Sequence, residues 1–235
     1  MSTAVHQTNT TRAARLADVA RAMARYGLII LLATVFLLGS TQPAGKPVTL
    51  TREDVKVIAK VVTTEVDLRL NDLDLRAQIH AVIDTMLNRL ASGRWGKTMK
   101  SVADSPWQFS RINGPSWAYG SVDKMPDLAV SPKVAAEVQR WLARRESGAP
   151  SSVGDAMNYL NPAFSSTRAV NGWGRAVLAQ AEQNGHIFGS GRSKHYHGTA
   201  ADLMRYRPGP LHVRLAPGAR TIGLLGKSIA GRTTG

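Results

Sequence analysis

The strongest constraint on the fold is a long apolar stripe in LRAQIHAVIDTMLNRLASG, residues 75–93. Its apolar residues recur at helical spacing and form a wide face, and Gly93 follows as a typical helix stop. The members of this face are Leu75, Ile79, Val82, Ile83, Met86, Leu87 and Leu90. A helix with so wide an apolar face has to be buried against other elements, so this segment predicts the central helix of a globular domain.

Further helices are expected on both sides of it. Thr51 and Asp54 form a capping-box pattern for a helix over 52–65. Ser131 and Pro132 are typical of the start of another, running through VAAEVQRWLARRES. Short helices are expected over GDAMNYLNP and WGRAVLAQAEQ, whereas residues 94–130 carry no helical period. With few strand signals before residue 186, the pattern predicts a mainly α domain.

Composition narrows the possible partners. Thirty Lys and Arg against sixteen Asp and Glu give a net charge of +14, which favours an anionic partner such as nucleic acid, anionic lipid or a cell-wall polymer. No internal repeat or RNA-binding signature is present, so we do not expect nucleic acid. The chain has no cysteine, which excludes thiol nucleophiles and cysteine-bound zinc.

The N-terminus has the pattern of an export segment. Residues 1–25 are basic, residues 26–40 (YGLIILLATVFLLGS) are apolar, and residues 41–50 resemble a linker. Basic residues ahead of an apolar run keep that side in the cytoplasm. The apolar run is shorter than the ~20 residues of a typical spanning helix and also fits a signal peptide, but no clean cleavage site follows it. We therefore expect an uncleaved signal anchor, crossing the inner (cytoplasmic) membrane once and placing the rest outside it.

Glu65 is the candidate catalytic residue. It lies on the same helical stripe as Val55, Ile58 and Val62, at the partly negative C-terminal end of its helix. Burial and the helix end both favour the protonated form, as a general acid requires. The alternative is an ordinary solvated Glu at a helix end. In the loop that follows the central helix, Trp107, Trp117 and Tyr119 are candidates for stacking on sugar rings, and the alternative is that they fill gaps under the loop.

The order of motifs resembles the spore-cortex-lytic (SleB-type) family of cell wall hydrolases. The matching pieces are Glu65 at a helix end, QIHAVIDTMLNRLASG, the Gln-Phe pair at 108–109, DAMNYLNPAF, and GHIF after a Trp-led helix. The resemblance covers residues 51–188 and leaves 189–235 as a C-terminal extension. It implies a lysozyme-like α+β catalytic domain in which Glu65 is the catalytic acid. The implied substrate-binding positions are Gln108, Phe109, Ser110, Tyr159 and Asn161.

By this resemblance the chain is a peptidoglycan-degrading enzyme that cleaves the glycan strand without a cofactor. A two-carboxylate glycosidase needs a partner for Glu65, and Asp67, Asp104 and Asp123 are the candidates. A lytic transglycosylase needs only one carboxylate, because groups of the muramic acid sugar intercept the cation. The exported anchor is typical of phage endolysins in host lysis, and a bacterial remodelling enzyme would have the same features.

Two other functions stay open. SKHYHGTAADL, residues 193–203, resembles the zinc motif of D-Ala-D-Ala carboxypeptidases and related endopeptidases, with His195, Asp202 and His212 as ligands. Gly209, however, stands where that family has an acidic residue. If the motif is not functional, His195 and His197 are expected on the surface of an extended tail. The remaining alternative is a basic, membrane-tethered binding protein for wall polymer or nucleic acid.

Overall fold

The computed structural model describes residues 45–115 and 118–220. The predicted cytoplasmic segment 1–25 and signal anchor 26–40 lie outside these residues. Within them, no helix combines the length and hydrophobicity needed to cross a membrane. The predicted linker 41–50 is in part a strand, because Lys46–Leu50 forms β1.

The first two helices form where their capping residues place them. Helix α2, Arg52–Glu65, is capped by Thr51 in a capping box with Asp54, as predicted. Helix α3, Asp72–Ser92, begins three residues earlier than the stripe suggested, because the Asn71 side chain accepts hydrogen bonds from the first-turn amides. It ends at Gly93, whose φ of 70° is the left-handed conformation that favours glycine.

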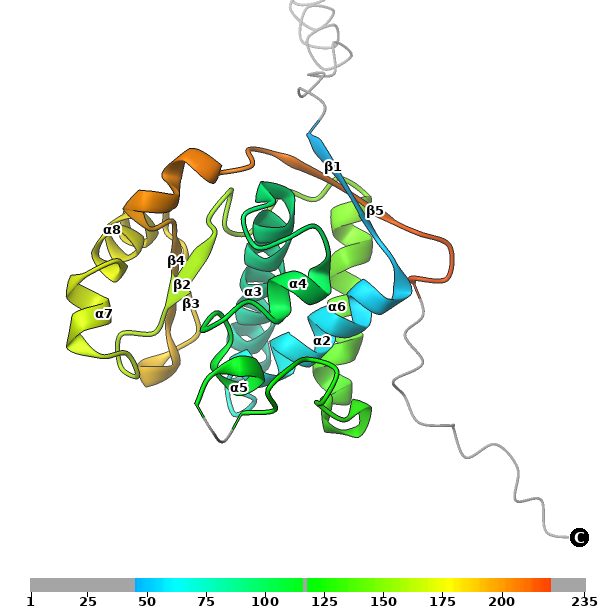
Figure 1. Ribbon diagram of the computed structural model, residues 1–235, viewed down its shortest axis with the longest axis horizontal. Helices are drawn as coiled ribbons and strands as arrows, with labels where there is room; N and C mark the ends of the chain where they lie inside the picture. Colours follow the sequence, from blue (N-terminus) through cyan, green and yellow to red (C-terminus); the bar gives the residue numbers. More distant parts are fainter. Residues whose placement is uncertain (1–44, 116–117, 221–235) are drawn as a thin grey trace, which may run out of the picture. The chain divides into compact units, whose positions relative to one another are not determined.

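Helix α3 is the centre of the fold, with helices on one side and a small sheet on the other (Figure 1). Helices α2 and α6 (Pro132–Glu146) pack against it and bury one continuous apolar core. The stretch 94–130, expected to be irregular, contains the short helices α4 (Met99–Ala103), α5 (Ser110–Asn113) and η1 (Asp127–Ala129). They are too short to show a period in the sequence.

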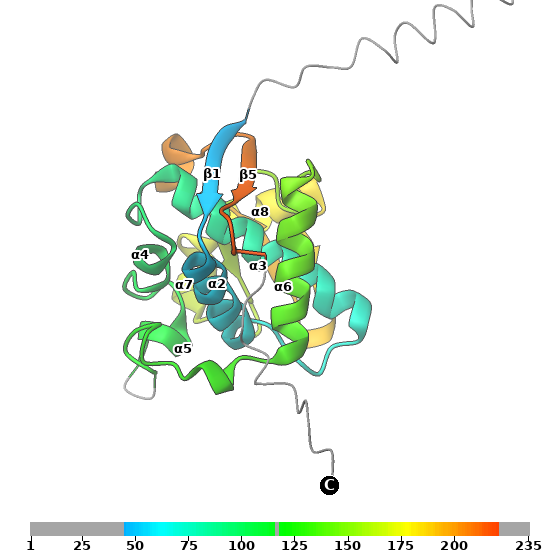
Figure 2. The ribbon, with the colours of Figure 1, turned by 90° about the vertical axis from the view of Figure 1, so that its right-hand side faces the viewer.

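Two small sheets complete the fold. β1 pairs in parallel with β5, Leu211–Leu215, and Figure 2 shows the two strands side by side, with β5 packing against α6. The second sheet is antiparallel with the order β2 (Asn158–Leu160), β4 (His195–Gly198), β3 (Ile187–Phe188). Helices α7 (Thr167–Asn171) and α8 (Gly174–Asn184) lie between β2 and β3 in the chain, and η2 (Gly191–Ser193) and η3 (Ala201–Tyr206) flank β4.

The sheets correct two expectations and place one predicted boundary. The helix expected over 154–162 is wrong, because Asn158–Leu160 pairs with β4, and this distant pairing outweighs local helix propensity. The predicted boundary at residue 188 falls inside the second sheet, since β4 comes after it. His195 and His197 are buried on β4 rather than exposed on a tail. The described residues thus form a mixed α+β fold.

Candidate active site

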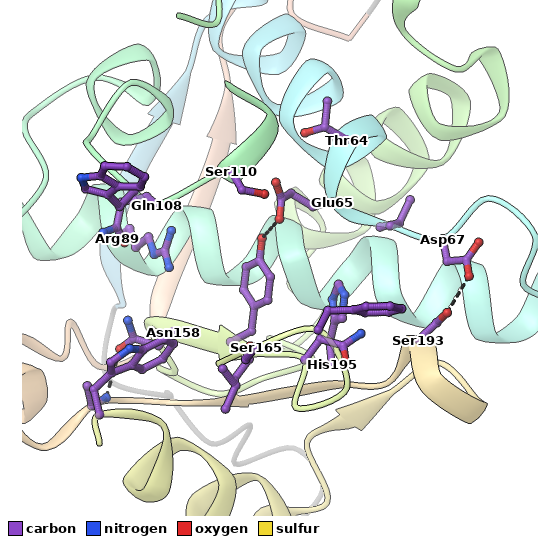
Figure 3. A pocket seen from close by; sticks show the side chains of 18 of the residues that line it. Thr64, Glu65, Asp67, Arg89, Gln108, Ser110, Asn158, Ser165, Ser193 and His195 are labelled. Atoms are coloured by element: carbon purple, nitrogen blue, oxygen red, sulfur yellow. Dashed lines mark hydrogen bonds between the residues drawn. The ribbon is translucent and has the colours of Figure 1, made fainter. Parts of the chain in front are cut away.

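Glu65 is the last residue of α2, and its side chain enters a cleft of about 890 Å³ (Figure 3). Val55, Ile58 and Val62 on the same stripe are buried, as their spacing predicted. Although Glu65 as a whole is only partly buried, its Oε1 is enclosed and has no hydrogen-bond partner within the described part of the chain. Its Oε2 accepts a hydrogen bond of 2.6 Å from the Tyr159 hydroxyl.

This environment raises the pKa of Glu65, chiefly because burial removes water from the carboxylate. The hydrogen bond from Tyr159, the positive charge of Arg89 and a hydrogen bond with Thr64 act in the opposite direction but do not cancel the effect. The position at the C-terminal end of α2 adds to the rise, since the helix dipole disfavours a negative charge there. Glu65 therefore keeps its proton to a higher pH than an exposed glutamate.

Arg89 is a buried cation beside this carboxyl group that the sequence analysis missed. Its side chain lines the cleft from α3, and the residue is only 3% exposed. Its Nε donates to the Met157 carbonyl at 2.7 Å, and its guanidinium lies 5.3 and 5.1 Å from the ring centres of Trp95 and Phe109. Arg89 lies on the same helical face as Val82 and Met86. An arginine within an apolar stripe is unusual, and this pattern could have identified Arg89 as a functional residue.

A second carboxylate, Asp67, lines the same cleft but has a different environment. Its oxygens accept hydrogen bonds from the Arg69 guanidinium at 2.9 and 3.1 Å and from the Ser193 hydroxyl at 2.5 Å. These contacts hold the pKa of Asp67 well below its usual range, so it is ionised. The other candidates, Asp104 and Asp123, both pair with Lys100 and do not line the cleft.

The predicted substrate-binding residues are only partly brought together. Gln108, Ser110, Tyr159 and Asn161 line the cleft with Glu65. Phe109 does not line it and is fully buried in the core, where it packs under the guanidinium of Arg89. Tyr119 is not a lining residue either and packs against the core, and Trp117 lies outside the described residues.

The alternative zinc site is not assembled. His195 and Asp202 line the cleft, whereas His212 lies on β5 in the other sheet. Among the residues described, no group of three or more His, Asp or Glu side chains is placed to hold a metal ion. Instead, the His195 ring stacks on Tyr159 with ring centres 5.1 Å apart, and burial lowers the pKa of His195 to about 4. His195 is therefore a neutral ring that supports Tyr159 from β4.

Trp107, a predicted sugar-stacking candidate, lines the cleft, and so do Phe164 and Trp173, which the sequence analysis did not predict. In comparisons with known proteins, the chain matches no family model, no curated protein and no solved structure. The function of the chain is therefore inferred from the geometry of this site.

Proposed function

We propose that the protein degrades peptidoglycan by cleaving the glycosidic bond between N-acetylmuramic acid and N-acetylglucosamine, with Glu65 as general acid and then base. The observation that carries the proposal is the buried, proton-retaining carboxyl group of Glu65 at the end of α2, facing an open cleft and bonded to Tyr159. A general acid has to keep its proton to a higher pH than an exposed carboxyl group does and has to lie within reach of substrate, and the raised pKa of Glu65 and its place in the cleft favour both. Such a helix-end acid in an α+β domain is what a lysozyme-like enzyme needs.

In the first step, the protonated Glu65 gives its proton to the glycosidic oxygen as the bond from the sugar C1 to that oxygen breaks. Positive charge develops on the ring, and Glu65 becomes a carboxylate. Tyr159 already donates to Oε2, and Arg89 supplies a nearby positive charge, so the newly formed carboxylate is stabilised where it stands. Because both groups favour the ionised form, Glu65 stays deprotonated until the second step returns a proton to it.

The second step distinguishes transglycosylation from hydrolysis. In transglycosylation, the C6 hydroxyl of the muramic acid sugar attacks C1 and gives its proton back to Glu65, which leaves an anhydro end. In hydrolysis, water takes the place of this hydroxyl. Of the predicted partners for Glu65, only Asp67 lines the described cleft, which Asp202 lines as well, and Arg69 and Ser193 already occupy the oxygens of Asp67. This occupation favours the route that needs one carboxylate.

The setting that fits this activity is outside the cytoplasmic membrane, with residues 26–40 as a single-pass anchor and the cleft on the extracytoplasmic side. The net charge of +14 favours attachment to an anionic cell wall. An exported enzyme of this kind suits host lysis by a phage endolysin. Peptidoglycan is thus the proposed partner, with the membrane contacted through the N-terminal segment.

The test is to digest purified peptidoglycan with the protein and to identify the released fragments by mass. Anhydro-muramic ends would support transglycosylation, and reducing sugar ends would support hydrolysis by a muramidase. Release of free stem peptides with intact glycan strands, or release of no fragments, would contradict the proposal. Glu65→Gln is the matched control, because it keeps the shape of the side chain and removes its acid function.

A further inference from the structure

Exposed aromatic side chains are concentrated at the cleft. Among the large apolar side chains that are strongly exposed in the described ranges, the aromatic ones are Trp107 at 75%, Phe164 at 68% and Trp173 at 45%. All three line the cleft that holds Glu65. The exposed aliphatic residues Leu73 and Leu128 lie elsewhere. Large apolar rings that stay in water at one site mark a binding surface, because they gain free energy when a ligand covers them.

These three residues, which we call the aromatic rim, come from separate parts of the chain. Trp107 lies between α4 and α5, Phe164 follows β2, and Trp173 immediately precedes α8. The rings therefore belong to both the helical side and the sheet side of the fold. A ligand that contacts all of them has to extend across the cleft that also holds Glu65.

The backbone at Trp107 gives an independent indication of function. Its φ is 61°, in the left-handed region, where a bulky residue is strained. Residues held in such conformations concentrate at functional sites, where the surrounding structure maintains the strain. At Phe164, the Arg192 guanidinium lies 5.3 Å from the ring centre and supports one face of that ring.

The charges of the cleft indicate which ligand the rim binds. Arg69 and Arg89 are its lining cations, and Asp67 and Asp202 are its lining anions beside Glu65. Arg69 is already paired with Asp67, and Arg89 is buried. A single-stranded nucleic acid also stacks on aromatic rings, but it needs a positively charged groove to follow its phosphates. The balanced charge favours the uncharged faces of sugar rings instead.

We propose that the aromatic rim binds a linear glycan over several consecutive sugar rings, so that the substrate is a polymer strand rather than a mono- or disaccharide. The cleft volume of about 890 Å³ fits this, because it lies near the upper end of the ~300–1,000 Å³ of typical small-molecule sites. The inference rests on the proposed function for the cleavage at Glu65, while the binding itself is tested without cleavage.

The experiment measures binding of β-1,4-linked N-acetylglucosamine oligomers of increasing length to the full chain carrying Glu65→Gln. Calorimetry gives the affinity, and tryptophan fluorescence reports on the rim directly. We expect affinity to rise with oligomer length. Trp107→Ala, Phe164→Ala and Trp173→Ala are each expected to weaken binding of the longest oligomer roughly tenfold, as the loss of one ring–ligand stacking contact predicts.

The matched controls are Leu73→Ala and Leu128→Ala, which remove exposed apolar side chains outside the cleft and should leave affinity unchanged. Trp107→Gly removes the ring and also relieves the left-handed backbone, so we expect it to melt at a higher temperature while binding more weakly. If Trp107 had only a structural role, Trp107→Gly would change the melting temperature and the affinity in the same direction.

The proposal is overturned if affinity does not depend on oligomer length, or if the rim variants behave like the leucine controls. It is also overturned if single-stranded DNA competes for the cleft with the steep salt dependence of phosphate binding. Failure of the proposed function looks different. In that case wall cleavage is absent or survives Glu65→Gln, while the rim variants still weaken glycan binding.

Discussion

Glu65→Gln is expected to stabilise the protein at neutral and alkaline pH while removing its activity. The carboxyl group is enclosed, its Oε1 has no partner within the described residues, and burial raises its pKa above the ordinary value of 4.5. The folded protein therefore binds this proton more tightly than the unfolded chain does. A neutral amide avoids the cost of ionising the group in the folded state.

The sign and size of the effect follow from proton linkage. Below pH 4.5 the carboxyl group is protonated in both the folded and the unfolded state, so Glu65→Gln should change stability little. Between 4.5 and the raised folded-state pKa, the wild-type protein loses up to about 1.4 kcal/mol of stability per pH unit relative to the variant. Above the folded-state pKa the difference becomes constant.

The assay is urea or thermal denaturation of both proteins across this pH range. Each 1 kcal/mol corresponds to a shift in Tm of about 2–4 °C for a domain of this size. The pH at which the difference becomes constant gives the pKa of Glu65 in the folded protein. A variant that is less stable at every pH, or a difference that does not change with pH, would refute the reasoning that Glu65 is held protonated.

Three further variants test the neighbours of Glu65. Tyr159→Phe removes a hydrogen bond that lowers the pKa of Glu65. The upper limb of the pH profile of kcat/KM should therefore move to higher pH. A limb that stays in place or moves to lower pH would contradict this prediction. Arg89→Gln should raise the pKa of Glu65 in an NMR titration because it removes a nearby cation. Arg89→Lys is the control that keeps the charge. If Glu65 titrates equally in both variants, Arg89 has no electrostatic effect on it. Asp67→Asn should lower the free energy of unfolding at pH 7 by about 1 kcal/mol, since Arg69 is largely exposed. Because the folded-state pKa of Asp67 is depressed, this loss should shrink as the pH falls below 3.8, and a loss that persists unchanged in acid would contradict it.

The helical part of the site was predictable because its signals are local. Thr51 and Asp54 fix the start of α2, and the apolar spacing then places Glu65 at the buried end of that helix. The same reasoning gave α3 and its stop at Gly93. These signals depend on residues within a few helical turns of one another, so they can be recognised in a single sequence.

The sheet side of the cleft was less predictable because its contacts are distant in sequence. β2 has only three residues, and it is a strand because it pairs with β4. This pairing places Tyr159 against Glu65 and stacks His195 under it, a role that the zinc motif hid. The sequence also does not show that Phe164 and Trp173 line the same cleft. Their positions depend on the long-range strand pairing and not on local propensity.

The most direct test of the central claim is the rate at which Glu65→Gln releases soluble fragments from purified peptidoglycan, compared with the wild-type protein at the same pH. If Glu65 donates the proton to the glycosidic oxygen, the variant should be slower by about 100- to 10,000-fold, the usual contribution of a general acid, while remaining folded. A variant that degrades peptidoglycan at the wild-type rate would contradict the account.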